Sequence, residues 1–413
     1  MALMADVRHG RPGVWLAERV NGRGSIRRDD VVARIEEARS RFARFQAPLA
    51  ALLGGGTWDG VIRSDLIDIS QAGGPQLLVK GDHALPMTGS IKARGGVHEL
   101  LKHVEEIASR RGLLRDDTDY MTLTTAEARA ILSAYEVSVA STGNLGFSIG
   151  LVGRAFGLRV VVHMSHDAKR WKMDRLSVAG ATVIEHGGDY GAACAAARVG
   201  TPDDAFHHFV DDEGSEDLFF GYAVAAQELA AQITALGFRP TAERPLVVHL
   251  PCGVGGAPGG ITCGLKIIYG DAVVCAVVEP VAAPCMMLAL ANPVSRGSEP
   301  PSVYDYGLDN RTAADGLAVA RASSLVLDIV GGAIDAAISV DDPTMFKTAQ
   351  QAWHAAGLKL EPSAAASLAS VPALIDATRG RSGWPDLSEA VHVAWATGGS
   401  MLPAHEWAAV LAA

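Results

Sequence analysis

Positive charge is scarce in this sequence. Its 36 Lys and Arg residues are outnumbered by 46 Asp and Glu residues, which gives a formal net charge of -10 at pH 7. A chain with this balance offers no basic face to nucleic acid or to anionic lipid. It also lacks an apolar run of transmembrane length and a basic flank before an apolar signal core. We therefore expect neither nucleic acid nor a membrane as a partner.

Cysteine is also sparse, and its spacing excludes the common structural uses of thiols. The five cysteines are odd in number and form neither a CxxC pair nor a Cys/His cluster with zinc-ligand spacing. They are Cys194, Cys252, Cys263, Cys275 and Cys285. Free thiols in a reducing compartment fit this pattern best, so we expect a cytoplasmic protein.

The length and the order of the predicted elements favour an α/β protein with two domains. At 413 residues the chain exceeds the size at which a single hydrophobic core keeps growing. Short β-branched runs alternate with helical patterns between residues 77 and 278, and a further strand is predicted at 389–396. This alternation is typical of parallel sheets with helices on both faces. The charged segment 110–119 is the predicted linker into a second unit.

One lysine, Lys92, lies between a glycine–serine turn and a glycine pair in the stretch TGSIKARGG. It follows a predicted strand and begins a predicted helix, whose apolar residues recur at helical spacing from Val97 to Ile107. A helix dipole disfavours a cation in the first turn, so we expect a lowered lysine pKa and a free amine. A free amine is what attack on an aldehyde requires. The alternative is an ordinary surface lysine.

Two glycine-containing turns follow predicted strands, where ligands bind in open α/β sheets. The turn at 141–148, STGNLGFS, presents hydroxyls and backbone amides to a substrate carboxylate, although a plain helix cap is the alternative. The loop at 253–260, GVGGAPGG, carries five glycines in eight residues, which favours a phosphate site over a structural turn. It matches neither a Walker A loop nor the dinucleotide fingerprint.

A third turn, TGGS at 397–400, places the hydroxyl of Thr397 at the end of the last predicted strand. A hydroxyl in that place can pair with a ring nitrogen. A lysine, an anion-binding turn, a phosphate loop and a hydroxyl are together what a phosphorylated aldehyde cofactor and an amino-acid substrate require. Pyridoxal phosphate meets this description.

In this order the motifs resemble those of the bacterial D-serine dehydratases, pyridoxal phosphate enzymes of the tryptophan-synthase β-like fold (fold type II). The motifs are SIKARGG, STGNLGFSIG, PCGVGGAPGG, DGLAV, LEPSA and WATGGSM, and the resemblance extends from about residue 77 to residue 403. It implies two open α/β domains with mostly parallel sheets and the cofactor between them. The large domain would comprise residues 1–116 and 227–413, and the small domain residues 117–226.

The resemblance also implies a role for individual residues. Lys92 would form the internal aldimine, Asn144 would hydrogen-bond the phenolic oxygen of the cofactor, and Thr397 would face its pyridine nitrogen. The phosphate would be bound by Gly253, Val254, Gly255, Gly256 and Ala257. The substrate carboxylate would be held by Ser90, Ser141, Thr142 and Gly143.

The implied activity is elimination of water from D-serine to give pyruvate and ammonia, which is a lyase reaction. Removal of the Cα proton from a D-amino acid calls for a base on the face opposite Lys92. Asp211 and Asp212 follow a predicted strand and are the candidates, with Asp211 preferred; a solvated acidic turn is the alternative. Glu279, at another strand end, is the candidate ligand for a monovalent cation, and a plain strand-end carboxylate is equally compatible.

The sequence leaves several alternatives open. A relative of the same fold type acting on D-threonine, L-serine or β-hydroxyaspartate would carry the same lysine and turns. A pyridoxal-phosphate-binding protein without activity is a second alternative, against which stand the extra hydroxyls of Ser141 and Thr142. A nucleotide-binding protein is a third, weakened by the missing Walker lysine and dinucleotide acid. Whether the protein is a monomer or a homodimer also stays open.

Overall fold

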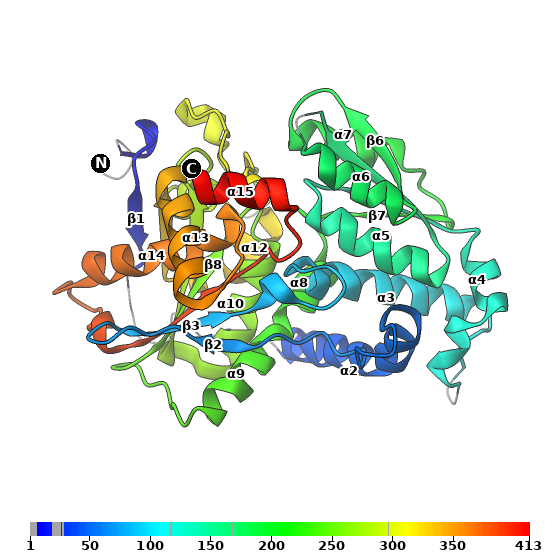
Figure 1. The fold of residues 1–413 in the computed structure, drawn as a ribbon, viewed down its shortest axis with the longest axis horizontal. Coiled ribbons are helices and arrows are strands. Elements are labelled where there is room, and N and C mark those ends of the chain that lie inside the picture. The colour runs from blue at the N-terminus through cyan, green and yellow to red at the C-terminus, as the bar shows by residue number, and fades with distance from the viewer. Residues whose placement is uncertain (1–5, 19–25, 27–28, 116–117, 167, 296) are drawn as a thin grey trace.

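The computed structural model describes residues 6–18, 26, 29–115, 118–166, 168–295 and 297–413. Within these residues the chain forms a seven-stranded sheet and a four-stranded sheet. Figure 1 shows the helices and strands of the smaller sheet, in green, beside the larger part of the molecule. The predicted domain boundary between residues 116 and 117 lies outside the described residues, and the second predicted boundary falls within a helix, so the division stays a prediction.

The larger sheet is parallel except at its two edges, as the order β1-β10-β9-β8-β11-β3-β2 and the strand pairings show. Both edge strands, β1 and β2, pair antiparallel with their neighbours. The strands in sheet order are β1 (Gly13–Leu16), β10 (Ala336–Val340), β9 (Val273–Pro280), β8 (Leu246–Pro251), β11 (Val391–Trp395), β3 (Gln76–Lys80) and β2 (Leu66–Asp68).

The smaller sheet is parallel throughout, in the order β6-β5-β4-β7. Its strands are β6 (Thr182–His186), β5 (Arg159–Ser165), β4 (Glu136–Ala140) and β7 (His207–Val210). Helices α5 (Asn144–Phe156), α6 (Arg170–Val178) and α7 (Tyr190–Gly200) connect them. The prediction of an α/β protein with mostly parallel sheets is therefore confirmed.

The remaining helices surround the larger sheet and join the two sheets. They are α2 (Asp29–Leu53), α3 (Lys92–Arg110), α4 (Ala126–Leu132), α8 (Glu216–Ala223), α9 (Ala225–Ala235), α10 (Gly256–Tyr269), α11 (Cys285–Ala291), α12 (Ser324–Val330), α13 (Asp342–Ala356), α14 (Pro362–Thr378) and α15 (Ala404–Ala412).

Strand β8 shows why the central strands have no polar face. Successive side chains of a strand point to opposite faces of the sheet. Val248 belongs to the core formed with α9 and α10, while Val247 belongs to the core formed with α13 and α14. Since helices cover both faces, the run is apolar except for His249, whose ring is hydrogen-bonded to Ser370 of α14 at 2.7 Å.

Helix α3 is the central connection between the two sheets, and its glycine pair has a packing role. A Cβ atom on Gly95 would lie 2.3 Å from the ring of Tyr222 in α8, and one on Gly96 would lie 2.7 Å from Leu145 in α5. Glycine in a helix interior costs about 1 kcal/mol relative to alanine. Here it allows α5 and α8 to approach the helix that begins with Lys92.

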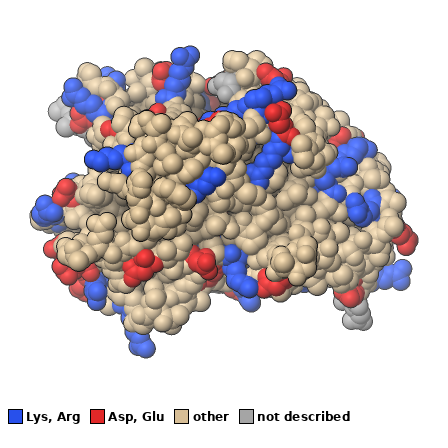
Figure 2. All heavy atoms as spheres, in the orientation of Figure 1, with Lys and Arg blue, Asp and Glu red and all other residues tan. Residues whose placement is uncertain are grey.

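Charged side chains lie mainly toward the outline of the face of the molecule seen in Figure 1, around a largely uncharged centre. Figure 2 shows basic and acidic side chains interspersed there, without an extended area of one sign. Among the residues that the structure describes, no helix combines the length and the apolarity needed to cross a bilayer.

Candidate active site

A cavity lies where the carboxyl ends of strands from both sheets meet the N-terminus of α3. It is lined by residues of the turns that follow β4, β8 and β11. Of the residues named from the sequence it contains Lys92, Ser141, Thr142, Asn144, Gly253, Val254, Gly255, Gly256, Ala257 and Thr397. The lining does not include Ser90, Gly143, Asp211 or Glu279. The three predicted turns thus form a single site.

Lys92 is the first residue of α3, and its amine points to a carboxylate. Its Nζ lies 2.9 Å from Oδ2 and 3.1 Å from Oδ1 of Asp212. Burial lowers the pKa of Lys92, but the Asp212 carboxylate and the Tyr222 hydroxyl outweigh it, so the pKa is raised above its ordinary value. The prediction of a lowered pKa was wrong, because a carboxylate at hydrogen-bonding distance acts more strongly than a helix dipole.

The two aspartates that follow β7 point in different directions. Asp212 faces Lys92, whereas the carboxylate of Asp211 is bound by the guanidinium of Arg198 at 2.9 Å. Successive residues at the end of an extended strand project to opposite sides. The structure therefore places Asp212, and not the preferred Asp211, beside Lys92.

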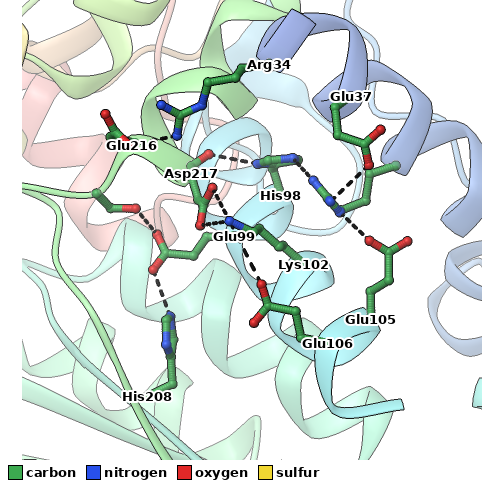
Figure 3. Close-up of polar contacts among 12 residues, drawn as sticks. Arg34, Glu37, His98, Glu99, Lys102, Glu105, Glu106, His208, Glu216 and Asp217 are labelled. Carbon is green, nitrogen blue, oxygen red and sulfur yellow. Dashed lines mark hydrogen bonds and ion pairs between the residues drawn. The ribbon is translucent and has the colours of Figure 1, made fainter. Parts of the chain in front are cut away.

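The loop that carries Asp212 is braced by α3 itself. Glu99 accepts hydrogen bonds from the hydroxyl of Ser215 and, at 2.9 Å, from the ring of His208. Figure 3 shows these contacts together with the ion pair between Lys102 and Asp217 at the start of α8. One helix thus presents the lysine and holds the loop that supplies its partner.

A buried histidine of α3 completes this brace. His98 Nδ1 lies 2.8 Å from the carbonyl oxygen of Asp217, and His98 Nε2 lies 2.9 Å from the guanidinium of Arg41 (Figure 3). Burial lowers the pKa of His98 to about 4. The ring is therefore neutral near pH 7, donating from Nδ1 and accepting at Nε2 from Arg41, since a guanidinium can only donate.

The glycine loop has the geometry of an anion site. Helix α10 begins at Gly256, and its cap residue Gly255 has φ +110° and supplies no side-chain acceptor for the first turn. The first amides of a helix have no intrahelical partner, so they are directed at the cavity with the positive end of the dipole. A Cβ atom on Gly255 would lie 2.6 Å from Met286. In the same lining, the buried hydroxyl of Ser363 has no partner among the described residues.

The serine turn acts partly as a helix cap. The Oγ of Ser141 accepts hydrogen bonds from the amides of Gly143 and Gly146, both at 2.9 Å. Gly143 itself has φ +135°, and a Cβ there would lie 2.4 Å from the side chain of Lys172. The Ser141 oxygen therefore serves the turn, as the cap alternative predicts. Its hydroxyl hydrogen and the side chain of Thr142 remain for a ligand.

Asn144 and Thr397 are each held by backbone or side-chain contacts. The amide of Asn144 donates to Oε1 of Glu361 at 3.2 Å. The carbonyl of Thr397 accepts from the amide of Ile91 at 2.8 Å, which ties the last strand to the start of α3. Ser90 pairs with Gly398 in an isolated bridge, and its buried hydroxyl has no partner among the described residues.

Glu279 lies behind the glycine loop. Its two carboxylate oxygens accept from the amides of Met286 and Met287 at 2.6 and 2.8 Å, at the start of α11. Burial raises the pKa of Glu279 to about 8 despite these bonds. Its role as a cation ligand stays a prediction.

One group of potential metal ligands is present in the described part of the chain, and it does not include Glu279. It consists of Cys194, Asp211 and Glu213. The guanidinium of Arg198 already contacts both carboxylates, at 2.9 and 3.4 Å. A positive charge of the protein itself therefore balances this group.

A buried ionic network beneath the site was not predicted. Arg94 binds Asp82 through Nε at 2.7 Å and Glu228 through Nη1 at 2.8 Å. The indole of Trp395 also donates to Asp82, at 2.8 Å. The sequence does contain one sign of this network. Lys80 is a charged residue at the end of a largely apolar strand, and a charge in that position implies a buried counter-ion.

The groups that line the cavity fit pyridoxal phosphate. Lys92 offers the amine for an aldehyde, the uncapped start of α10 offers donors for a phosphate, and Thr397 offers a hydroxyl for a ring nitrogen. All three lie at the carboxyl edge of parallel strands, where cofactors bind in open sheets.

Comparison with known proteins agrees with this fit. Residues 58–385 match the family described as "Pyridoxal-phosphate dependent enzyme". A protein of Pseudomonas aeruginosa (strain UCBPP-PA14) named "Probable D-serine dehydratase" is 42% identical over 99% of this chain and 95% of its own length. A protein of Burkholderia pseudomallei (strain 668) with the same name is 52% identical over 79% of this chain and 74% of its own length.

Two solved structures share the fold at low sequence identity. Diaminopropionate ammonia lyase from Escherichia coli, in complex with D-serine, superimposes with a TM-score of 0.72 at 18% identity, covering 97% of each chain. An L-serine ammonia-lyase from the fungus Rhizomucor miehei superimposes with a TM-score of 0.62 at 17% identity, covering 84% of this chain and 97% of its own. On the family match and on the identity to these relatives, the chain belongs to the pyridoxal-phosphate dependent enzymes.

Proposed function

We propose that the protein is a D-serine dehydratase, a lyase that converts D-serine to pyruvate and ammonia with pyridoxal phosphate as cofactor. The observation that carries the proposal is the pair formed by Lys92 and Asp212, 2.9 Å apart at a cavity that also contains the glycine loop. An amine and a carboxylate in contact can exchange a proton. The substrate is taken from the names of the relatives described above.

Each group of residues in the cavity has a role that follows from its position. When bound, the cofactor draws electrons away from the substrate Cα. Asp212, whose carboxylate lies beside the Lys92 amine, takes up the Cα proton, and the contact between the two side chains sets their relative protonation. The start of α5, with Ser141 and Thr142, holds the substrate carboxylate through hydroxyl and amide donors. Asn144, oriented by Glu361, donates to an oxygen of the cofactor.

The phosphate and the ring have separate anchors. The loop from Gly253 to Ala257 receives the phosphate at the start of α10, and Ser363 adds a hydroxyl that is otherwise unpaired. Thr397 presents a neutral hydroxyl to the ring nitrogen. Ser90 and Gly143, just behind the lining, support these turns.

The test is a keto-acid assay on purified protein saturated with pyridoxal phosphate. D-serine, L-serine, D-threonine and L-threonine are compared in parallel at equal concentration. Pyruvate from D-serine well above the product of the other three is expected. If another hydroxy-amino acid gives more keto acid than D-serine, the cofactor assignment stands and the proposed substrate changes. If the protein binds the cofactor but forms no keto acid from any of the four amino acids, a non-catalytic binding protein is favoured.

Three further expectations belong to the same proposal. The large domain comprises residues 1–116 and 227–413, and residues 117–226 form the small domain that carries the four-stranded sheet. A monovalent cation, bound at Glu279, supports the loop in front of it. The protein acts in the cytoplasm, since its five cysteines are buried free thiols, as in proteins of reducing compartments.

A further inference from the structure

The hydroxyl of Tyr190 is buried and has no hydrogen-bond partner among the described residues. Tyr190 begins α7, next to the cavity that contains Lys92. A second cavity of about 610 Å³ adjoins the first, and Tyr190 lines both of them together with Thr142 and Glu361. The residue therefore lies between the reacting groups and the outer cavity.

Contacts from both parts of the molecule fix the position of this tyrosine. Its ring belongs to an apolar cluster with Val254 of the glycine loop and Val319. The residue before it, Asp189, caps α7 by accepting from Ala192 at 3.0 Å and accepts from the hydroxyl of Tyr304 at 2.7 Å. Because the apolar cluster packs against the ring and the cap fixes the backbone, the side chain has little freedom to move its hydroxyl to another partner.

An unpaired buried hydroxyl calls for an explanation. Leaving such a group without a partner destabilises the folded protein. Burial and the carboxylate of Asp212 raise the pKa of Tyr190 well above its ordinary value. The phenol therefore keeps its proton near pH 7 and is available as a donor. What it lacks is an acceptor, and a substrate in the cavity can supply one.

We propose that the Tyr190 hydroxyl donates a hydrogen bond to the side-chain hydroxyl of the amino-acid substrate and orients it for departure. The inference rests on the proposed function, since it assumes a β-hydroxy-amino acid. Tyr190 acts by binding and keeps its own proton; the proton removed from Cα balances the hydroxide that leaves, so that the two depart as water. Because a site built to pair with a hydroxyl discriminates against analogues that lack one, Tyr190 is also a determinant of specificity.

The test compares two leaving groups in Tyr190→Phe, which removes one oxygen and keeps the ring. Steady-state kinetics are measured with D-serine and with β-chloro-D-alanine, whose chloride leaves without a hydroxyl to orient. We expect kcat/KM for D-serine to fall at least about tenfold, in line with the loss of one hydrogen bond, and kcat/KM for β-chloro-D-alanine to stay within about twofold. Equal loss for both substrates, or no loss for either, would overturn the inference.

A matched variant and a binding measurement separate this role from a structural one. Tyr269→Phe deletes the same atom at the far end of α10, outside both cavities, and should leave both substrates unaffected. D-alanine lacks the hydroxyl, so its dissociation constant, read from the cofactor absorbance, should match in Tyr190→Phe and parent. Weaker D-alanine binding or a lowered melting temperature in Tyr190→Phe would assign the residue to structure. If the parent prefers another hydroxy-amino acid, that substrate replaces D-serine in the same comparison.

Discussion

The amine of Lys92 and the carboxylate of Asp212 meet at 2.9 Å, although 120 positions separate them in the sequence. Lys92 begins α3, the helix that comes after β3 of the larger sheet. Asp212 follows β7 of the smaller sheet. Their contact thus depends on how the two sheets are placed relative to each other. A displacement of one sheet against the other would separate the Lys92 amine from the Asp212 carboxylate that accepts its hydrogen bond.

Replacing Lys92 by Ala should abolish turnover and the visible absorbance of bound pyridoxal phosphate. The amine is the group that would react with the aldehyde, and among the described residues no other lysine lines the same cavity. Lys347→Ala, at an exposed position of α13, is the control and should behave as the parent. Keto-acid production and absorbance report the outcome, and turnover within tenfold of the parent in Lys92→Ala would contradict the assignment.

Asp212→Asn should reduce kcat for D-serine by about 10²-fold or more, the usual contribution of a positioned base. Asp211→Asn is the matched variant, and its effect should be much smaller because Asp211 pairs with Arg198 instead. With Cα-deuterated D-serine, the isotope effect on kcat should increase in Asp212→Asn alone. Similar kinetics in the two variants would contradict the assignment of Asp212 as the base.

Gly255→Ala should weaken the binding of pyridoxal phosphate by about 5- to 150-fold, corresponding to about 1–3 kcal/mol of backbone strain. Its φ of +110° is unfavourable for alanine, and the added Cβ would lie 2.6 Å from Met286. Gly200→Ala, at the end of α7, meets nothing within 4 Å and serves as the control. Titration of apoenzyme with the cofactor measures the change, and equal affinity in both variants would argue against the loop as the phosphate site.

Stability should fall as the pH is lowered from about 6.5 to about 4, with part of the decline due to His98. Its pKa is about 4 in the folded protein against 6.5 ordinarily, so the unfolded chain binds the proton more tightly. The stabilisation is therefore fully present above pH 6.5 and is lost as the pH falls through the folded value. The slope from one such group is at most about 1.4 kcal/mol per pH unit.

Melting temperatures of the parent and of His98→Gln across this range test the effect. The variant should have a shallower dependence on pH, whatever its stability at pH 7. His405→Gln, an exposed histidine of α15, should keep the slope of the parent. A parallel decline in all three proteins would show that other groups account for the acid sensitivity.

The sequence alone was sufficient for the fold class and for most of the cavity. Strands such as β8 are buried on both faces and read as largely apolar runs, and each of the three predicted turns follows a predicted strand. Parallel strands bring their carboxyl ends to one edge, so local pattern predicts which turns share a site. Strand β10 was not predicted, because its residues, Ala336–Val340, include two alanines, which have low strand preference.

Tertiary structure decided which side chains within those turns face one another. The choice between Asp211 and Asp212, the raised pKa of Lys92 and the unpaired hydroxyl of Tyr190 all depend on which side chains the fold brings together. The buried pairing of Arg94 with Asp82 likewise depends on the approach of distant segments. Periodicity and turn chemistry act over a few residues, whereas pKa values and hydrogen-bond partners depend on distances across the packed molecule, which only the folded chain determines.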